Sequence, residues 1–333
     1  MKSLFLCENT NNIIQVYAPE TINELKSEAD LCDTVYNKSA ILAEPDKFTN
    51  VEYIFSTWGM PVLSEEEIRK TFPALKCVFY SAGTVQTFAR PFLNCGVRVF
   101  SAWQANAVPV AEYTVSQILL ANKGFFATSR FMSTGDVECS YKVRSCYPGN
   151  YDVTVGLIGV GQISRLVIKL LKNYNLKVKV FSRSLTDDAA IQLGVEKCSL
   201  EELFATCQVI SNHLADNAST RGMLRREHFA SMLPYATFLN TGRGAQVVEE
   251  DLVDVLKERP DLTAVLDVTF PEPPQAGHSF YQLPNCILTP HIAGSSGNEV
   301  HRMAEYMAAE YHRYAAGESC HYEVTVKMLE TMA

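Results

Sequence analysis

The sequence predicts an α/β protein built from two doubly wound parallel-sheet domains, a flavodoxin-like one followed by a Rossmann-type one. Short apolar, β-branched runs alternate with amphipathic stretches, and that alternation is typical of a parallel sheet covered by helices on both faces. The alternating series occurs twice, on either side of a polar connector at residues 133–150. At 333 residues, the chain has the length of two ordinary domains.

The first series contains apolar runs that predict buried strands, in SLFLC, VEYIFS, LKCVFYS and VRVFS. Between the second and third runs, SEEEIRKTF has a capping serine and an acidic first turn, and a proline follows it, so it predicts a helix. A long apolar stretch, Val108–Phe126, predicts a helix that is buried on most sides, either in the core or at a subunit interface.

The second series predicts strands in VTVGLIG, LKVKVFS, CQVIS, YATFLN and TAVLDV. Near the end of the chain, residues 298–317 predict a helix that crosses back to pack on the first domain. We therefore expect a discontinuous substrate domain, residues 1–102 with 295–333, and a cofactor domain of residues 103–294. Such a division allows a cleft to close by hinge motion at two chain crossings.

Composition and charge exclude several classes of function. A net charge of −8 argues against a general affinity for nucleic acid or an anionic membrane. No apolar stretch approaches the roughly 18 residues of a membrane span, and the N-terminal run is too short for a signal peptide. The ten cysteines are scattered without a CxxC pair, so we expect free, buried thiols in a reducing compartment. We expect a cytoplasmic protein that binds no metal.

The segment VTVGLIGVGQISRLVIKLL has the spacing of a dinucleotide-binding loop between a strand and a helix. Gly159 allows a tight turn, and Gly161 lets the backbone approach a pyrophosphate. Ser164 stands where a third glycine is usual and is small enough for close packing. The pyrophosphate would lie at the helix N-terminus, beside Gln162 and Ile163.

The tip of the following strand bears on the choice of cofactor. An acidic residue about 20 positions after the glycines normally binds the ribose hydroxyls. Here the strand ends in Ser182, Arg183 and Ser184. An arginine flanked by two hydroxyls suits a 2′-phosphate, so the sequence favours NADP over NAD. Alternatively, Arg183 is a solvated residue that stacks on the adenine, which would allow either cofactor.

Three later segments place chemically active side chains after predicted strands, where ligands of open α/β sheets bind. Arg243 lies between two glycines, and its guanidinium matches a carboxylate with two parallel hydrogen bonds. Asp267 and Glu272 follow one strand, and His291 follows the next. A carboxylate beside a histidine stabilises the imidazolium, which makes the pair a candidate acid–base group. Taken singly, each residue is more often structural.

In their order along the chain, ANAVPVAEYT, GLIGVGQIS, LNTGRGAQVVEEDL, and LDVTFPEPP with TPHIAG resemble the D-isomer-specific 2-hydroxyacid dehydrogenases. The resemblance runs from about Ser81 to Gly294. It implies an NAD(P)-dependent oxidoreductase that moves a hydride between the cofactor and C2 of a 2-keto or 2-hydroxy acid. It also implies that Arg243 clamps the substrate carboxylate, that His291 donates or accepts the proton, and that Glu272 pairs with His291.

The resemblance further suggests binding residues and a homodimer formed through the Val108–Phe126 region. The SAGT segment makes Ala82 and Gly83 candidate contacts for the substrate carboxylate. Trp58, at a predicted strand tip, is either a substrate contact that faces the active cleft or a core residue. The expected cofactor contacts are Gly159, Gly161, Gln162, Ile163, Ser182, Arg183, Ser184, His213, Asn217, Thr241, Asp267 and His291.

Some features depart from the family pattern and leave alternatives open. Ala215 and Asn217 replace the usual proline and threonine of the loop that contains His213, so the contacts of this loop are not implied. Formate dehydrogenases have glutamine where Glu272 stands, which disfavours formate. Trp58 leaves room for an unusual sugar- or polyol-derived substrate. A non-catalytic NAD(H) sensor, like the corepressors that resemble this family, is the rival from another functional class.

Overall fold

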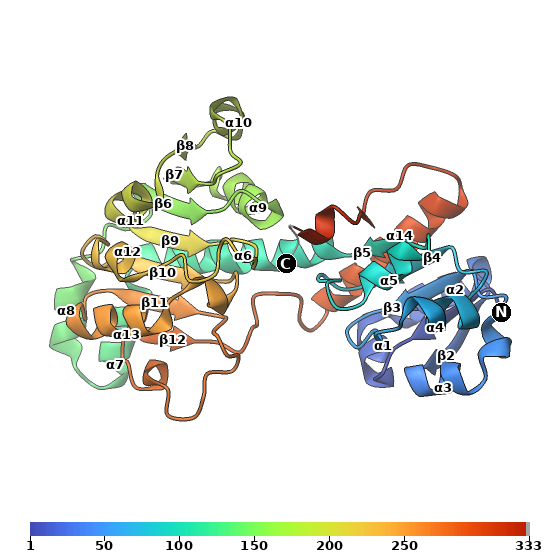
Figure 1. The fold of residues 1–333 in the computed structure, drawn as a ribbon. Helices are drawn as coiled ribbons and strands as arrows, with labels where there is room; N and C mark the ends of the chain where they lie inside the picture. Colours follow the sequence, from blue (N-terminus) through green and yellow to red (C-terminus); the bar gives the residue numbers. More distant parts are fainter. Residues whose placement is uncertain (331–333) are drawn as a thin grey trace. The chain divides into compact units, whose positions relative to one another are not determined.

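The computed structural model describes residues 1–330, which form two compact units. One unit contains Met1–Asn106 and the segment from Ser295 onward, and the other contains Ala107–Gly294 (Figure 1). Each unit is built on a sheet of mainly or entirely parallel strands with helices packed against it, which confirms the predicted fold class.

The six-stranded sheet of the first unit has the order β13-β5-β4-β3-β1-β2. Its five parallel strands follow the flavodoxin-like order, and β13 adds an antiparallel edge next to β5. The strands are β1 Ser3–Leu6, β2 Leu31–Tyr36, β3 Tyr53–Ser56, β4 Cys77–Tyr80, β5 Arg98–Ser101 and β13 Glu323–Val324. The four predicted strands are confirmed, but β2 was not predicted because this edge strand is only partly buried and contains Asp33 and Thr34.

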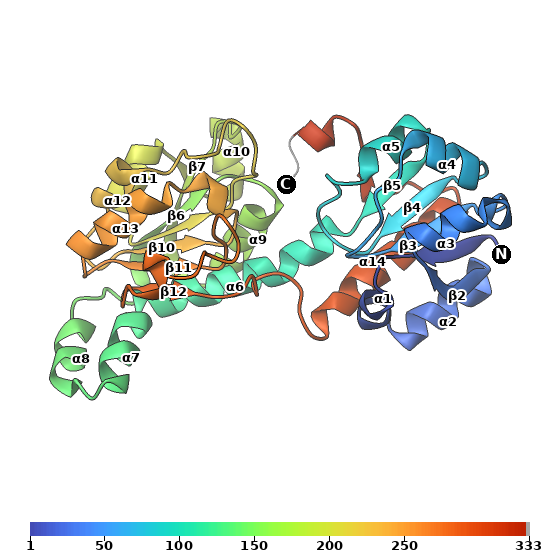
Figure 2. The same cartoon turned by 60° about the horizontal axis from the view of Figure 1, so that its bottom comes forward.

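The helices of the first unit form two groups, one on each face of the sheet (Figure 2). The long C-terminal helix α14 packs against α1, α2 and β4, whereas α3, α4 and α5 pack on one another. The predicted helix in SEEEIRKTF is confirmed as α4, and Ser64 and Glu67 form its capping box. The helices are α1 Thr10–Val16, α2 Pro19–Glu28, α3 Lys38–Ala43, α4 Glu65–Thr71, α5 Ala89–Asn94 and α14 Glu299–Ala315, with 3₁₀ turns at Pro45–Phe48 and Met328–Glu330.

The seven-stranded sheet of the second unit is fully parallel, in the order β12-β11-β10-β9-β6-β7-β8. Counted from β6, this is the Rossmann order with one additional strand at the β12 edge. All five predicted strands of the second series are present. The strands are β6 Tyr151–Ile158, β7 Asn175–Phe181, β8 Glu196–Lys197, β9 Val209–Asn212, β10 Thr237–Asn240, β11 Thr263–Leu266 and β12 Cys286–Leu288.

Two sequence predictions about the second unit were wrong in detail. The helix predicted at Val108–Phe126 corresponds to α6, which spans Trp103–Asn122. Gly124, with φ of +69°, separates α6 from the next helix. The predicted connector at 133–150 contains α8, which was missed because only Ser140 of its residues is buried. The helices are α6 Trp103–Asn122, α7 Phe125–Ser133, α8 Val137–Arg144, α9 Gln162–Leu171, α10 Asp187–Leu193, α11 Leu200–Thr206, α12 Arg226–Ala230 and α13 Glu249–Glu258, with 3₁₀ turns at Gly244–Gln246 and Ser279–Tyr281.

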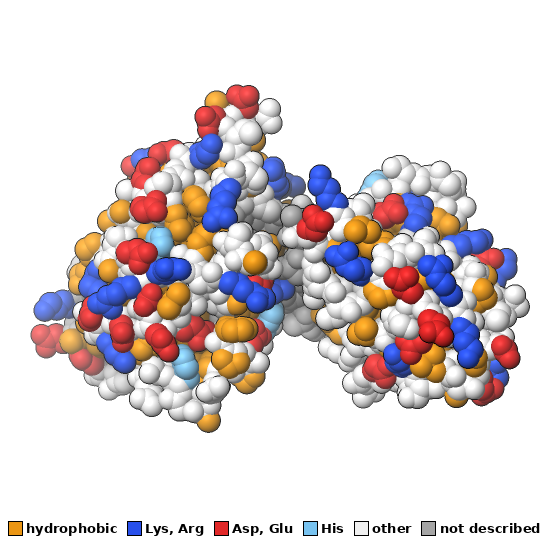
Figure 3. Space-filling model, in the orientation of Figure 1, with side chains coloured by type: hydrophobic (Ala, Val, Ile, Leu, Met, Phe, Trp, Pro, Cys, Tyr) orange, Lys and Arg blue, Asp and Glu red, His pale blue; other side chains and the backbone are white. Residues whose placement is uncertain are grey.

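Surface and cysteine properties only partly match the expectations. All ten cysteines are free, but only Cys7, Cys77 and Cys207 are buried and Cys146 is exposed, so the prediction of generally buried thiols was wrong. On the face shown in Figure 3, basic and acidic side chains are interspersed over both units. Within residues 1–330, no helix combines the length and apolar character needed to cross a membrane.

A buried carboxylate holds the C-terminal segment in the first unit. Glu310 of α14 is fully buried, and its oxygens accept hydrogen bonds from the backbone N–H groups of His321, at 2.9 and 3.0 Å, and Tyr322, at 3.2 Å. Arg313 donates to the same carboxylate at 2.6 Å. Because the segment then continues into β13, Glu310 fixes the edge strand against β5.

Replacing Glu310 with alanine should lower the free energy of unfolding by about 3–5 kcal/mol, because it leaves Arg313 and two backbone donors without an acceptor. Urea denaturation of the full chain measures the change. Glu305→Ala is the matched control, since Glu305 lies on the same helix but is exposed. Equal losses in the two variants would contradict the assigned role of Glu310.

Candidate active site

The glycine loop lies where β6 turns into α9. Gly159 has φ of +96°, and a Cβ there would lie 2.9 Å from the carbonyl oxygen of His213, so only glycine fits. Gly161 is the N-cap of α9 without a side-chain cap, and a Cβ at Gly161 would meet nothing within 4 Å. The first N–H groups of α9, at Gln162 and Ile163, therefore lie next to open space. This uncapped, accessible helix end fits the pyrophosphate of a dinucleotide.

Ser164 lies in the third position of the glycine motif and is fully buried in α9. Its side chain is small enough for the helix to pack closely on the sheet, as a glycine would allow. Its hydroxyl has no hydrogen-bond partner among residues 1–330.

The loop after β7 presents an exposed arginine. Ser182 and Ser184 face each other with hydroxyl oxygens 3.1 Å apart, and Arg183 projects from between them. One nitrogen of Arg183 donates to the hydroxyl of Ser219 at 3.3 Å, and within the described chain the guanidinium forms no ion pair. Its positive charge is thus available to an anionic group.

His213 is a neutral residue of the site. Its Nε2 lies 2.9 Å from the hydroxyl of Ser211, and its Nδ1 lies 3.5 Å from the hydroxyl of Thr241. Burial lowers the pKa of His213 to about 3, so the imidazole is uncharged at neutral pH. In the next loop, the side-chain oxygen of Asn217 accepts two bonds from Ser219, so in the structure it shapes the loop itself.

Arg243 follows β10 and is half-buried. Its Nη1 donates to the carbonyl oxygen of Gly242 at 2.7 Å, and no residue of 1–330 accepts a hydrogen bond from its other guanidinium nitrogens. A Cβ at Gly244 would lie 2.0 Å from the backbone carbon of Thr269, so glycine is required for this loop to pack on the loop after β11. Among the described residues, Arg243 forms no ion pair. The hydrogen bond from Arg221 is the main cause that lowers the pKa of Asp216, and the charge of Arg243 contributes to the same shift.

Glu272 and His291 form the predicted pair. Oε1 of Glu272 lies 2.6 Å from Nδ1 of His291, and both side chains are partly exposed, at 38% and 47%. Since Nδ1 is engaged by the carboxylate, Nε2 is the ring nitrogen that can exchange a proton with another molecule. Within residues 1–330, Nε2 has no hydrogen-bond partner. A cavity of about 450 Å³ borders Glu272 and Asp267.

Asp267 holds the loop that contains His291. This carboxylate is 1% exposed, and it accepts the N–H groups of Ile292 and Ala293 at 2.8 and 2.9 Å and the hydroxyl of Thr289 at 2.5 Å. The carbonyl oxygen of Asp267 accepts the N–H of His291 at 3.1 Å. From the sequence, Asp267 was predicted to contact the cofactor, and its anchoring role was not predicted. The TPHIA segment is too short to show a periodic pattern that would indicate such contacts.

The predicted substrate contacts of the first unit lie after β3 and β4. Trp58 is 38% exposed, which rules out the alternative of a core tryptophan. Ala82 is fully buried and Gly83 is half-buried. The hydroxyl oxygen of Ser101 lies 2.9 and 2.6 Å from the carbonyl oxygens of Ala82 and Gly83, so its single hydrogen is shared between these two acceptors.

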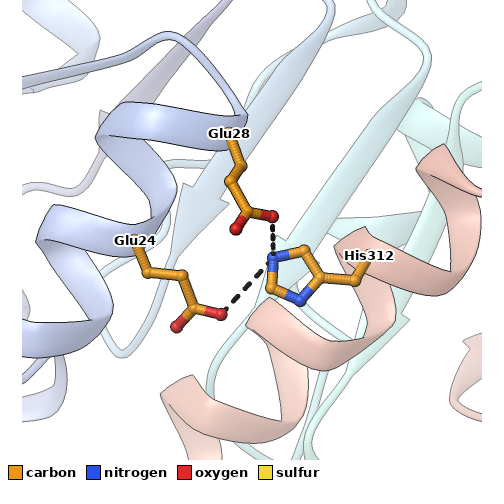
Figure 4. A group of neighbouring side chains, drawn as sticks. All are labelled: Glu24, Glu28 and His312. Carbon is orange, nitrogen blue, oxygen red and sulfur yellow. Dashed lines mark ion pairs between the residues drawn. The ribbon is translucent and has the colours of Figure 1, made fainter.

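One group of three described side chains could offer metal ligands, namely Glu24, Glu28 and His312 in the first unit (Figure 4). Nε2 of His312 lies 2.9 Å from Glu28 and 3.5 Å from Glu24, and both contacts are ion pairs when the imidazole is protonated. Ion pairing alone accounts for this arrangement of α2 and α14, so we assign no metal to it.

Comparison with known proteins identifies the family of the second unit. Residues 115–293 match the family model of the NAD-binding domain of D-isomer-specific 2-hydroxyacid dehydrogenases. The putative 2-hydroxyacid dehydrogenase YoaD of Bacillus subtilis is 33% identical over 205 residues, which are 60% of this chain and 59% of that protein. Glyoxylate reductase of Thermococcus litoralis is 32% identical over 165 residues, half of each chain. The matches thus span less than two thirds of these relatives.

Solved structures show the same fold along nearly the whole chain. A phosphoglycerate oxidoreductase from Rhizobium etli has a TM-score of 0.80 at 19% identity, covering 98% of this chain and 99% of that one. D-mandelate dehydrogenase of Rhodotorula graminis has a TM-score of 0.80 at 18% identity, with 97% of each chain covered. At these identities, the likeness concerns the fold alone.

The buried His213 should make stability depend on pH. The pKa of a histidine in an unfolded chain is about 6.5, whereas the pKa of His213 in the folded protein is about 3. Between these values the unfolded state binds a proton that the folded state does not, so this contribution is full above pH 6.5 and is lost as the pH falls. Between pH 7 and pH 5 the free energy of unfolding should fall by about 2 kcal/mol through His213.

Urea denaturation of the wild type and of His213→Gln, at pH 7, 6 and 5, measures this effect. Between pH 7 and pH 5, the free energy of unfolding should fall by about 2 kcal/mol less in His213→Gln than in the wild type. Parallel curves for the two proteins would show that His213 titrates normally in the fold.

Proposed function

Because this chain belongs to the D-isomer-specific 2-hydroxyacid dehydrogenases, we propose that it is an oxidoreductase that interconverts 2-keto and 2-hydroxy acids with a nicotinamide cofactor. The observation that best supports this is the pair formed by Glu272 and His291, with 2.6 Å between Oε1 and Nδ1 and with no hydrogen-bond partner for Nε2 among residues 1–330. In the same unit, Arg243 follows β10, which is the neighbour of β11 in the sheet, and Glu272 follows β11. Arg243 forms no ion pair with the described residues.

In the proposed reaction, His291 is the proton donor for reduction and the acceptor for oxidation. A nicotinamide cofactor held at the glycine loop of the second unit would supply or accept the hydride at C2 of the substrate. Nδ1 of His291 donates to Glu272, which leaves Nε2 to give its proton to the carbonyl oxygen. The hydrogen bond to Glu272 orients the imidazole ring for this proton transfer.

Arg243 binds the substrate carboxylate in this proposal. Its Nη1 is held by Gly242, so Nε and Nη2 can form two parallel hydrogen bonds to a carboxylate. Ala82, Gly83 and Trp58 of the first unit are proposed as further substrate contacts, and the glycine loop of the second unit as the cofactor site.

NADP is the proposed preferred cofactor, and NAD the alternative. Arg183 is exposed, flanked by two hydroxyls and free of an ion pair in the described chain, which suits a 2′-phosphate.

The active protein is proposed to be a homodimer formed through the region around α6. Exposed apolar side chains on α6, α7 and α8 support this, namely Leu120, Phe125, Met132, Val137 and Tyr141. Sedimentation equilibrium tests the proposal, and a monomer at micromolar concentration would contradict it.

Turnover separates an enzyme from a non-catalytic sensor. Oxidation of NADPH and NADH should be followed with glyoxylate, hydroxypyruvate, pyruvate and phenylpyruvate. We expect turnover with at least one of them. Cofactor binding without turnover on this or a wider panel, including keto acids derived from sugars, would favour a sensor.

Substitutions in the site should separate proton transfer from substrate binding. His291→Ala should lower kcat by about 10²–10⁴-fold. Arg243→Ala should mainly raise the KM for the keto acid, because it removes the carboxylate ligand. Steady-state kinetics measure both parameters, and Arg90→Ala is a control because Arg90 is exposed in the first unit. Wild-type turnover in His291→Ala would overturn the mechanism.

Arg183→Ala should raise the KM for NADPH by about tenfold and leave that for NADH nearly unchanged, because one charge-assisted contact is lost. Lys172→Ala, an exposed change at the end of α9, is the control. A wild-type enzyme that uses NADH with equal or better kcat/KM would refute the NADP preference.

A further inference from the structure

A chain of hydrogen bonds leads from α6 to the loop that contains His291. The hydroxyl of Tyr113, on α6, lies 3.3 Å from Oγ1 of Thr289. Oγ1 of Thr289 lies 2.5 Å from Oδ1 of Asp267. The carbonyl oxygen of Asp267 then accepts the N–H of His291. All four residues lie within the second unit.

The chemistry of the groups fixes the direction of this chain. Each carboxylate oxygen of Asp267 also accepts a backbone N–H group, Oδ1 from Ile292 and Oδ2 from Ala293, and a carboxylate has no hydrogen to donate. Thr289 must therefore donate its single hydroxyl hydrogen to Asp267. Tyr113 must then donate to Thr289. Burial and the nearby Asp267 raise the pKa of Tyr113, so the phenol keeps its proton at neutral pH.

Every donor to Asp267 matters because this carboxylate is buried. It is 1% exposed and forms no ion pair with any described residue, so hydrogen bonds alone offset its desolvation. Two of these bonds come from Ile292 and Ala293, directly after His291. His291 itself has φ of +55°, a conformation that residues with a side chain adopt at a cost. The loop keeps this conformation through its bonds to Asp267.

We propose that Thr289 and Tyr113 are positioning residues for His291, which they align against Glu272 by completing the donors around Asp267. This inference rests on the proposed function, in which His291 exchanges the proton with substrate. Neither residue needs to touch the substrate or the cofactor. The effect of losing either hydroxyl should therefore fall on kcat and on the titration of His291, and not on the KM for the keto acid.

Three substitutions test the proposal in the full chain. Thr289→Val keeps the shape but removes the hydroxyl, and should lower kcat by about tenfold. Thr289→Ser keeps the hydroxyl and should stay near wild type. Tyr113→Phe removes the more distant donor and should lower kcat by about threefold. Tyr151→Phe is the control, since Tyr151 is 73% exposed.

A second measurement does not depend on catalysis. The titration of the His291 imidazole, followed by NMR and assigned with His291→Ala, should shift in Thr289→Val and Tyr113→Phe but not in Thr289→Ser or Tyr151→Phe. A purely structural role would lower thermal stability without moving this titration.

The outcomes separate the inference from the proposed function. Unchanged kcat and unchanged His291 titration in both Thr289→Val and Tyr113→Phe would overturn the inference. If the wild type reduces no keto acid, the proposed function fails, whereas the titration still decides whether Thr289 and Tyr113 position His291. A loss of activity in Thr289→Ser equal to that in Thr289→Val would also contradict the role of the hydroxyl.

Discussion

The candidate site of the second unit depends on the parallel register of its sheet. Hydrogen-bonded pairing aligns Ile158, Asn212, Asn240, Leu266 and Leu288 in one row across five neighbouring strands. Parallel strands all end at the same edge, so the residue after each member of this row emerges there. Those residues are Gly159, His213, Thr241, Asp267 and Thr289. The glycine loop, the neutral histidine and the anchor of the His291 loop thus come together through one constraint.

Electrostatics then distinguishes the site from the rest of the molecule. The chain as a whole has a net charge of −8. In the site, burial keeps His213 neutral, and hydrogen bonds surround the buried carboxylate of Asp267. Arg183 and Arg243 have no ion-pair partner among the described residues. An acidic protein can in this way present positive charge to anionic ligands at one edge of a sheet.

The extent to which each element is buried explains which elements could be predicted from the sequence. Buried parallel strands such as β6 and β10 are continuous apolar runs, and the Ser64 capping box marks the start of α4. The edge strand β2 and the surface helix α8 bury few side chains, so hydrophobic patterning does not show them. The start of α6 at Trp103 was also missed, although Trp103 packs against Tyr322 far along the chain.

By itself, the sequence determined the fold class, the glycine loop and the residue types of the site, because hydrophobic alternation and short motifs are local. The tertiary structure decided how these residues act on one another. Thr289 reaches Asp267 across 22 residues, and Tyr113 reaches Thr289 across 176. No local pattern encodes such partners, since a buried carboxylate obtains its donors only when the folded sheet brings distant loops together. For that reason Asp267 could be expected at the site, but its function as the anchor of His291 could not.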